Sequence, residues 1–138
     1  MEIRTLRRNI FQRIFGIPAT RAPSDDGCWE VSGRKLLIDL NRVPELSKPG
    51  GAIRLEGKNL HDRVLVIRAD DGTFRSFRNR CRHMGRRLDP VPGTETVQCC
   101  SVSKTTYSYD GQVLYGPAKE PVNTFPVEVI DNKLVISL

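Results

Sequence analysis

Cys81-Arg82-His83-Met84-Gly85 and, further along the chain, Cys99-Cys100-Ser101-Val102-Ser103 are the two stretches that carry most information about this sequence. A thiol and an imidazole two residues apart in one tight loop can reach neighbouring positions on a metal, because thiolate sulfur and imidazole nitrogen are common metal ligands. Gly85 allows the backbone to turn in ways that other residues avoid. Both stretches lie in residues 78–104, which we interpret as one long irregular segment. Long loops in compact domains are usually functional, so we expect the chemistry there.

Strand-like runs flank this segment on both sides. They are Leu36–Leu40, Ala52–Leu55, Arg63–Arg68, Thr73–Phe77, Thr106–Tyr109, Gln112–Tyr115, Phe125–Ile130 and Lys133–Leu138. Three short turn sequences, Asp70-Asp71-Gly72, Asp110-Gly111 and Asp131-Asn132, join neighbouring runs and are typical of β-hairpins. Short strands that recur with turns between them predict an all-β fold, an antiparallel β-sandwich or barrel.

Residues 1–33 differ from the rest, and we divide the chain into residues 1–33 and a β domain of residues 34–138. Apolar residues recur at helical spacing in the first 17 residues, at Ile3, Leu6, Ile10, Phe11, Ile14 and Ile17. This pattern predicts an amphipathic helix that packs its apolar stripe on the domain. A basic helix that faces a membrane surface or a partner is the alternative. Residues 18–33 are expected to be an extended connector in which Cys28 and Trp29 form a buried apolar pair.

The composition bounds the class of protein. The chain has 138 residues, with 22 Lys+Arg against 16 Asp+Glu, so its formal net charge is +6. This length corresponds to one domain, and no apolar run is long enough to cross a membrane. The basic start of the sequence lacks the apolar core of a secretory signal, which predicts a cytoplasmic protein with reduced thiols. The basic loops lack interleaved aromatic residues, so no nucleic-acid partner is expected.

The two quoted stretches resemble the Rieske iron–sulfur family. In that family a first loop, Cys-x-His-x-Gly, and a second loop, Cys-x-x-His-Gly, hold a 2Fe-2S cluster in a small all-β domain. Residues 81–85 match the first loop in full, and sixteen residues separate His83 from Cys100. The resemblance covers about residues 34–138 and implies cluster-binding loops at about residues 78–105. It implies metal ligation by Cys81, His83 and Cys100.

The resemblance also suggests residues that surround the cluster. Thr105 and Tyr107 stand five and seven positions after Cys100, where a hydroxyl residue and a tyrosine hydrogen-bond to cluster sulfur in high-potential members. An alternative is that both residues only open a β-strand. Gly85 and Pro117, the latter in a Gly-Pro loop that resembles the family's covering loop, complete the expected cofactor-binding set.

The second loop departs from the family pattern, because Ser103 occupies the place of the second histidine and Lys104 that of the following glycine. Ser103 could bind iron through a deprotonated oxygen, which would lower the potential. Cys99 could supply a third thiolate, although strand alternation favours Cys99 packing inward. A loop without any cluster and a mononuclear metal held by two Cys and one His remain further alternatives.

The resemblance implies a small electron carrier, or an electron-transfer subunit of an oxidoreductase, that is not a catalyst by itself. The alternative is a clusterless Rieske fold that serves as a binding or assembly module. A rim of cations surrounds the two loops and is expected to attract an acidic redox partner, although charge clusters are also common on solvated surfaces. The rim residues are Arg78, Arg80, Arg82, Arg86, Arg87 and Lys104.

Overall fold

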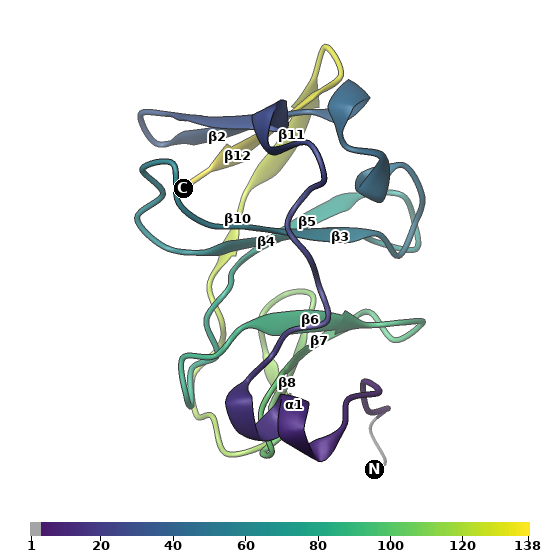
Figure 1. Cartoon of the computed structure of the whole chain (residues 1–138), viewed down its shortest axis with the longest axis vertical. Helices are drawn as coiled ribbons and strands as arrows, with labels where there is room; N and C mark the ends of the chain where they lie inside the picture. Colours follow the sequence, from purple (N-terminus) through teal and green to yellow (C-terminus); the bar gives the residue numbers. More distant parts are fainter. Residues whose placement is uncertain (1–3) are drawn as a thin grey trace.

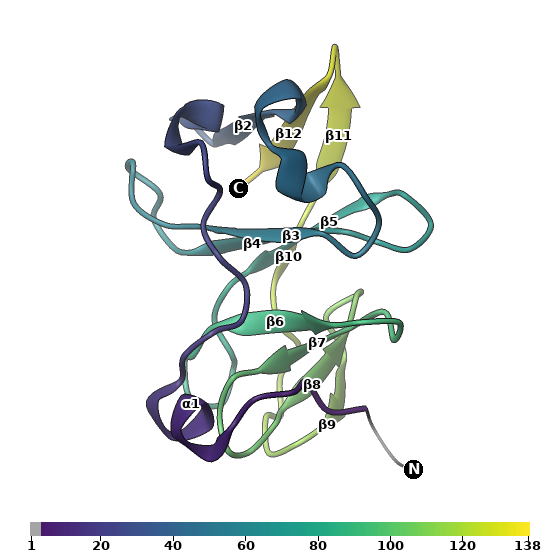
Figure 2. The same cartoon turned by 45° about the vertical axis from the view of Figure 1, so that its right-hand side comes forward.

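A computed structural model describes residues 4–138 as three stacked antiparallel layers (Figures 1 and 2). The outer sheet has the order β1 (Trp29–Ser32), β2 (Lys35–Asp39), β12 (Lys133–Ser137), β11 (Val127–Ile130). The middle sheet has the order β10 (Thr124–Phe125), β5 (Phe74–Arg78), β4 (Val64–Arg68), β3 (Ala52–Leu55). The lower sheet has the order β6 (Leu88–Val91), β7 (Thr96–Cys99), β8 (Thr106–Ser108), β9 (Val113–Tyr115). The predicted all-β antiparallel class is confirmed.

Strand β4 separates two hydrophobic cores. Val64 and Val66 belong to the core beneath the outer sheet, whereas Leu65 and Ile67 belong to the core above the lower sheet. Successive side chains of a strand point to opposite faces, so an unbroken apolar run such as this one serves both cores. Cys28 and Trp29 are buried in the outer core, as predicted for an apolar pair.

The three predicted hairpin turns are confirmed. β4 pairs with β5 around Asp70-Asp71-Gly72, β8 with β9 around Asp110-Gly111, and β11 with β12 around Asp131-Asn132. Asp131 and Asn132 have φ of 48° and 61°, the left-handed conformations that two-residue hairpins require.

The prediction that residues 78–104 form one irregular segment is wrong, because β6 and β7 form a hairpin inside it. Pro90, Pro92 and Gly93 obscured the strand pattern in the sequence. Pro90 is compatible with the structure because β6 is an edge strand of its sheet. Two shorter loops remain on either side of this hairpin: loop one, residues 79–87, and loop two, residues 100–105.

The predicted helix over residues 1–17 is also wrong in its extent. Residues 1–3, and with them Ile3, lie outside the described residues, and the helix α1 covers only Ile10–Phe15. Asn9 begins it with a capping box, in which its side chain accepts from the Gln12 N–H and its own N–H donates to the Gln12 side chain. Gly16, at φ 65°, ends it. The apolar side chains of α1 face outward, so the expected packing of an apolar stripe on the domain is wrong as well.

Residues 16–33 lead from α1 at one end of the molecule to the outer sheet at the other (Figure 1). The buried carboxylate of Asp89 accepts from the N–H groups of Ala19 and Thr20, at 2.9 and 2.7 Å. Short 3-10 turns at Asp26–Cys28, Leu40–Arg42 and Pro44–Leu46 flank β1 and β2. β1 pairs with β2 through residues 29–38. Within residues 4–138, no helix has the length and apolar character needed to cross a membrane.

Candidate metal centre

Loop one is a tight turn held by its own backbone. The N–H of Cys81 donates to the Arg86 carbonyl at 2.8 Å, and the N–H of Gly85 donates to the Cys81 carbonyl at 2.9 Å. Gly85 has φ 69°, which explains the glycine at this position. Arg63 reaches in from the start of β4 and donates to the Gly85 carbonyl at 2.5 Å. These hydrogen bonds hold loop one in its turn.

Cys81 is buried among groups that stabilise a thiolate. Its Sγ lies 3.4 Å from the Tyr107 hydroxyl and 3.5 Å from the His83 N–H. The Tyr107 oxygen accepts from the Arg82 N–H at 2.9 Å, which leaves the hydroxyl hydrogen free to point at the sulfur. A hydrogen bond from the Cys99 thiol and these further donors hold the pKa of Cys81 below its usual range. The same contact with Cys81, together with burial, raises the pKa of Cys99.

Cys81 and Cys99 face the same core, whereas Cys100 does not. Cys99 is fully buried at the end of β7 and belongs to the same core as Cys81 and Tyr107. Cys100 points to the other face, where its Sγ donates to the Gly16 carbonyl at 3.2 Å. Burial raises the pKa of Cys100. Alternation along the strand explains the difference, since neighbouring side chains cannot both face one core.

The remaining side chains of loop two form a chain of hydroxyl groups. Ser101 Oγ lies 2.7 Å from Ser103 Oγ, which lies 3.3 Å from Thr105 Oγ1. Thr105 is fully buried, and Gly116 packs against it so closely that a Cβ at position 116 would lie 2.7 Å from the Thr105 Cα. Pro117, which follows, is exposed. Ser103 and Thr105 therefore bond to each other rather than to the buried sulfurs.

The two histidines lie in different surroundings. His83 is exposed at the end of loop one, whereas His61 lines a pocket with Leu60, Phe125 and Leu138 that contains no residue of loop two. Within residues 4–138, no three His, Cys, Asp or Glu side chains are already arranged around a metal position. Cys81, His83 and Cys100 thus do not converge on one metal position. Ser103 occupies the place of the family's second histidine.

The cations around the loops are mostly paired within the protein. Arg78 and Arg80 contact Asp62, Arg82 contacts Glu120, and Arg87 contacts Glu56. A fifth rim residue, Arg86, donates to the carbonyl oxygens of Arg13 and Ile14. The positive field of this rim is correspondingly reduced.

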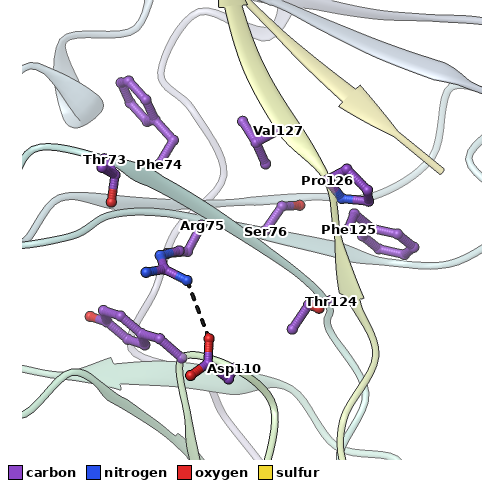
Figure 3. Close-up of a pocket in the computed structure, with 10 residues that line it drawn as sticks. Thr73, Phe74, Arg75, Ser76, Asp110, Thr124, Phe125, Pro126 and Val127 are labelled. Atoms are coloured by element: carbon purple, nitrogen blue, oxygen red, sulfur yellow. Dashed lines mark ion pairs between the residues drawn. The ribbon is translucent and has the colours of Figure 1, made fainter.

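A pocket of about 380 Å³ opens on another side of the molecule, between the middle sheet and the β8–β9 turn (Figure 3). Arg75 and Asp110 face each other across it at 3.5 Å. Its lining comes from residues 73–76, 109–110 and 124–127 and includes no loop-one or loop-two residue. The pocket is therefore separate from the thiol pair.

The fold and the thiol pair define the class of protein. The family described as the Rieske 2Fe-2S domain matches residues 40–126, and the chain belongs to this family. It is 26% identical over 105 residues to the cytochrome b6-f complex iron-sulfur subunit of Chlorobaculum tepidum, a match that covers 75% of this chain and 56% of that protein. It is 38% identical over 53 residues to the glycine betaine monooxygenase oxygenase subunit of Chromohalobacter salexigens, covering 38% of this chain and 12% of that protein. The chain thus spans only part of the length of these relatives.

Solved structures agree on the fold. The plasma membrane Rieske protein of Synechocystis matches with a TM-score of 0.52 and 21% identity, over 62% of this chain and 86% of that one. The ferredoxin of carbazole 1,9a-dioxygenase from Nocardioides aromaticivorans matches with a TM-score of 0.55 and 18% identity, over 65% and 86%. Family members therefore include electron-transfer components.

The family implies a 2Fe-2S cluster, and the donor chemistry of the two loops can be compared with that group. Two adjacent buried thiols, one of them surrounded by hydrogen-bond donors, suit iron bound by sulfur. The exposed imidazole of His83, two residues after Cys81, suits a second iron nearer the surface. The donor types match those of the family except at Ser103, a hydroxyl where the family has its second imidazole, but within residues 4–138 they are not gathered around one metal position. Cys99, for which strand alternation favoured inward packing, is fully buried in the core.

Proposed function

We propose that this domain binds a 2Fe-2S cluster between its two loops and acts as an electron carrier or electron-transfer subunit. The burial of Cys81 and Cys99 in one core, with the Tyr107 hydroxyl 3.4 Å from the Cys81 Sγ, is the observation that supports it. A 2Fe-2S cluster, when bound, supplies a one-electron redox couple. The four free, buried cysteines suit a reducing compartment such as the cytoplasm.

In this proposal four residues are the cluster ligands. Cys81 and Cys99 supply the two thiolates, in place of the pair Cys81 and Cys100 implied by family spacing. His83 supplies the imidazole, and Ser103 supplies an oxygen donor. An anionic oxygen in place of a neutral imidazole lowers the potential.

The residues around the proposed ligands have separate roles. Tyr107 donates to the Cys81 sulfur, withdraws electron density from it and raises the potential. Gly85 shapes loop one, while Gly116 allows the covering loop, which also contains the exposed Pro117, to approach Thr105. A redox partner would approach over the exposed His83. Lys104, for which no ion pair or side-chain hydrogen bond is found within residues 4–138, would offer a cation to an acidic partner.

Iron and acid-labile sulfide content under anaerobic conditions tests the proposal. We expect about two irons and two sulfides per chain after reconstitution, with visible absorption and an EPR signal in the reduced state. Cys81→Ser and Cys99→Ser should abolish the signal, whereas Cys100→Ser and the matched control Cys28→Ser should retain it. Loss in Cys100→Ser with retention in Cys99→Ser would instead assign the ligand by family spacing.

A clusterless binding module is the second candidate. The chain of hydroxyls from Ser101 to Thr105 favours it, because these groups satisfy one another without a metal. A wild-type protein that stays colourless and free of iron after anaerobic reconstitution would overturn the carrier proposal in favour of this one.

A further inference from the structure

Helix α1 is inverted relative to an ordinary surface helix. Its apolar side chains Ile10, Phe11, Ile14 and Phe15 are exposed, with Phe11 68% and Phe15 70% accessible. The side chain it buries is that of Arg13, which is only 5% accessible. A surface helix of a globular domain normally shows the opposite arrangement, with its apolar stripe on the core. The outward face of α1 is therefore built for contact with something outside the chain.

Polar contacts fix this orientation. The Arg13 guanidinium donates to the carbonyl oxygens of Ser101 and Leu6, at 3.1 and 2.6 Å, and to the Gln98 side chain at 3.2 Å. Arg86 of loop one donates to the carbonyl oxygens of Arg13 and Ile14 at the end of the helix. Because these bonds join α1 to both loops, the helix cannot rotate its apolar face inward without leaving a buried arginine unpaired.

The exposed apolar surface continues from α1 onto the loops. Met84 of loop one and Val102 of loop two are 51% and 56% accessible, and both line a shallow groove together with Ile14. We call the apolar patch the set Ile10, Phe11, Ile14, Phe15, Ile17, Met84 and Val102. Soluble domains rarely expose a contiguous apolar surface of this kind unless it is an interaction site.

The segment that contains α1 is basic. Residues 4–24 contain Arg4, Arg7, Arg8, Arg13 and Arg21 and no Asp or Glu. Arg4 and Arg7 are exposed, and within residues 4–138 neither forms an ion pair with a carboxylate. Loop-one rim arginines differ, because Asp62, Glu120 and Glu56 neutralise most of them. Arg8, which donates to the Ile17 carbonyl, and Arg86, which donates to the Ile14 carbonyl, lie beside the apolar patch, and no ion pair is found for either within residues 4–138. Arg4 instead reaches Pro92 in the β6–β7 turn, away from the patch.

We propose that the apolar patch docks on an anionic lipid bilayer, with α1 lying in the plane of the headgroups. Phenylalanine and isoleucine side chains enter the boundary of the acyl chains, and the flanking arginines contact lipid phosphates. Aromatic and aliphatic residues flanked by Arg8 and Arg86, which form no ion pair within residues 4–138, match this surface better than that of a folded protein. His83 adjoins Met84, so a partner that reaches His83 meets the protein at the bilayer surface.

Vesicle cosedimentation tests the proposal on the full chain. We expect binding to vesicles of phosphatidylcholine and phosphatidylglycerol, weaker binding to phosphatidylcholine alone, and a decrease with added salt. Phe11→Glu/Phe15→Glu should weaken binding at least tenfold. The matched control is Val129→Glu/Ile130→Glu, which changes two exposed apolar residues of the β11–β12 hairpin at the opposite end of the molecule (Figures 1 and 2). Equal melting temperatures establish that each variant is folded.

Three results would overturn the proposal. These are no binding by the wild type, equal binding to neutral vesicles, and binding that Phe11→Glu/Phe15→Glu leaves unchanged. Self-association that this variant abolishes, without vesicle binding, would assign the patch to a second copy of the chain instead. Iron content is measured on the same samples, so failure of the cluster proposal is seen separately.

Discussion

The Arg13 guanidinium of α1 lies 3.1 Å from the backbone oxygen of Ser101, 88 positions later in the chain. Burial lowers the pKa of Arg13. This contact connects a short helix to loop two, and it makes the position of α1 depend on loop two.

Arg13→Met should therefore be destabilising, because the apolar side chain fills the space but removes three hydrogen bonds and leaves the Leu6 carbonyl without its donor. We expect a loss of about 2 kcal/mol in the free energy of unfolding. Urea unfolding measures it, with Arg21→Met, at an exposed arginine, as the control. Equal stability of the two variants would show that the Arg13 contacts contribute little.

Glu56 should make stability depend on pH in the acid range. Hydrogen bonds from Arg87, and then from Arg54, lower the pKa of Glu56 from 4.5 to about 2. A depressed carboxyl pKa contributes stability that is fully present above the unfolded value and is lost as the pH falls from about 5 to about 2. With screening of these partly exposed groups, the contribution at pH 7 is about 1 kcal/mol.

Glu56→Gln should lose this increment at pH 7 and converge with the wild type near pH 2. Urea unfolding at several pH values measures the difference, and Glu30→Gln, at an exposed strand position, is the control. A constant difference between wild type and Glu56→Gln across the acid range would contradict the assignment.

The hairpin pattern and the Cys-x-His loop could be predicted from sequence because each depends on local chemistry. Asp-Gly and Asp-Asn turns define their own geometry, and Gly85 lies where the loop requires a left-handed residue. Strand β6 could not be predicted, because Pro90 is acceptable only once β6 is known to lie at an edge.

The helix and the second thiol required tertiary information. The spacing of apolar residues in α1 is correct, but which face is buried depends on Arg13 finding Ser101 and Gln98. Likewise, strand alternation predicts that Cys99 and Cys100 face opposite sides, but that Cys99 shares a core with Cys81 follows only from the register of β7 with β6 and β8.

Asp89→Asn should loosen the connector that follows α1. Asp89 is fully buried, and each of its oxygens accepts a backbone N–H, from Ala19 and Thr20. An amide has only one oxygen, so one of these N–H groups would face an NH₂ group. We expect a loss of about 1–2 kcal/mol.

Hydrogen exchange measures this effect at the Ala19 and Thr20 amides, which should exchange faster in Asp89→Asn. Glu128→Gln, at an exposed position of β11, is the control for loss of a charge. Unchanged protection of the Thr20 amide would contradict the prediction.

Gly116→Ala should be more destabilising than Gly72→Ala. Both glycines have positive φ, 100° and 87°, so alanine is strained at either position. Only at Gly116 would the added Cβ also collide with Thr105, because no atom lies within 4 Å of the corresponding position at Gly72. We expect about 1 kcal/mol for Gly72→Ala and at least about 2 kcal/mol for Gly116→Ala.

Thermal unfolding of the two variants measures this difference directly. Equal melting temperatures would mean that the covering loop moves away from Thr105 at little energetic cost.

Strand β4 couples the unfolding of the three layers. Its residues Val64 and Val66 lie in one core, and Leu65 and Ile67 lie in the other. Neither outer layer can detach without exposing one apolar face of this strand to water. Because both faces belong to the same backbone, loss of one core weakens the support of the other. The three layers should therefore unfold in a single cooperative transition. A substitution that destabilises the loops of the lower layer should also lower the stability of the outer sheet at the far end of the molecule.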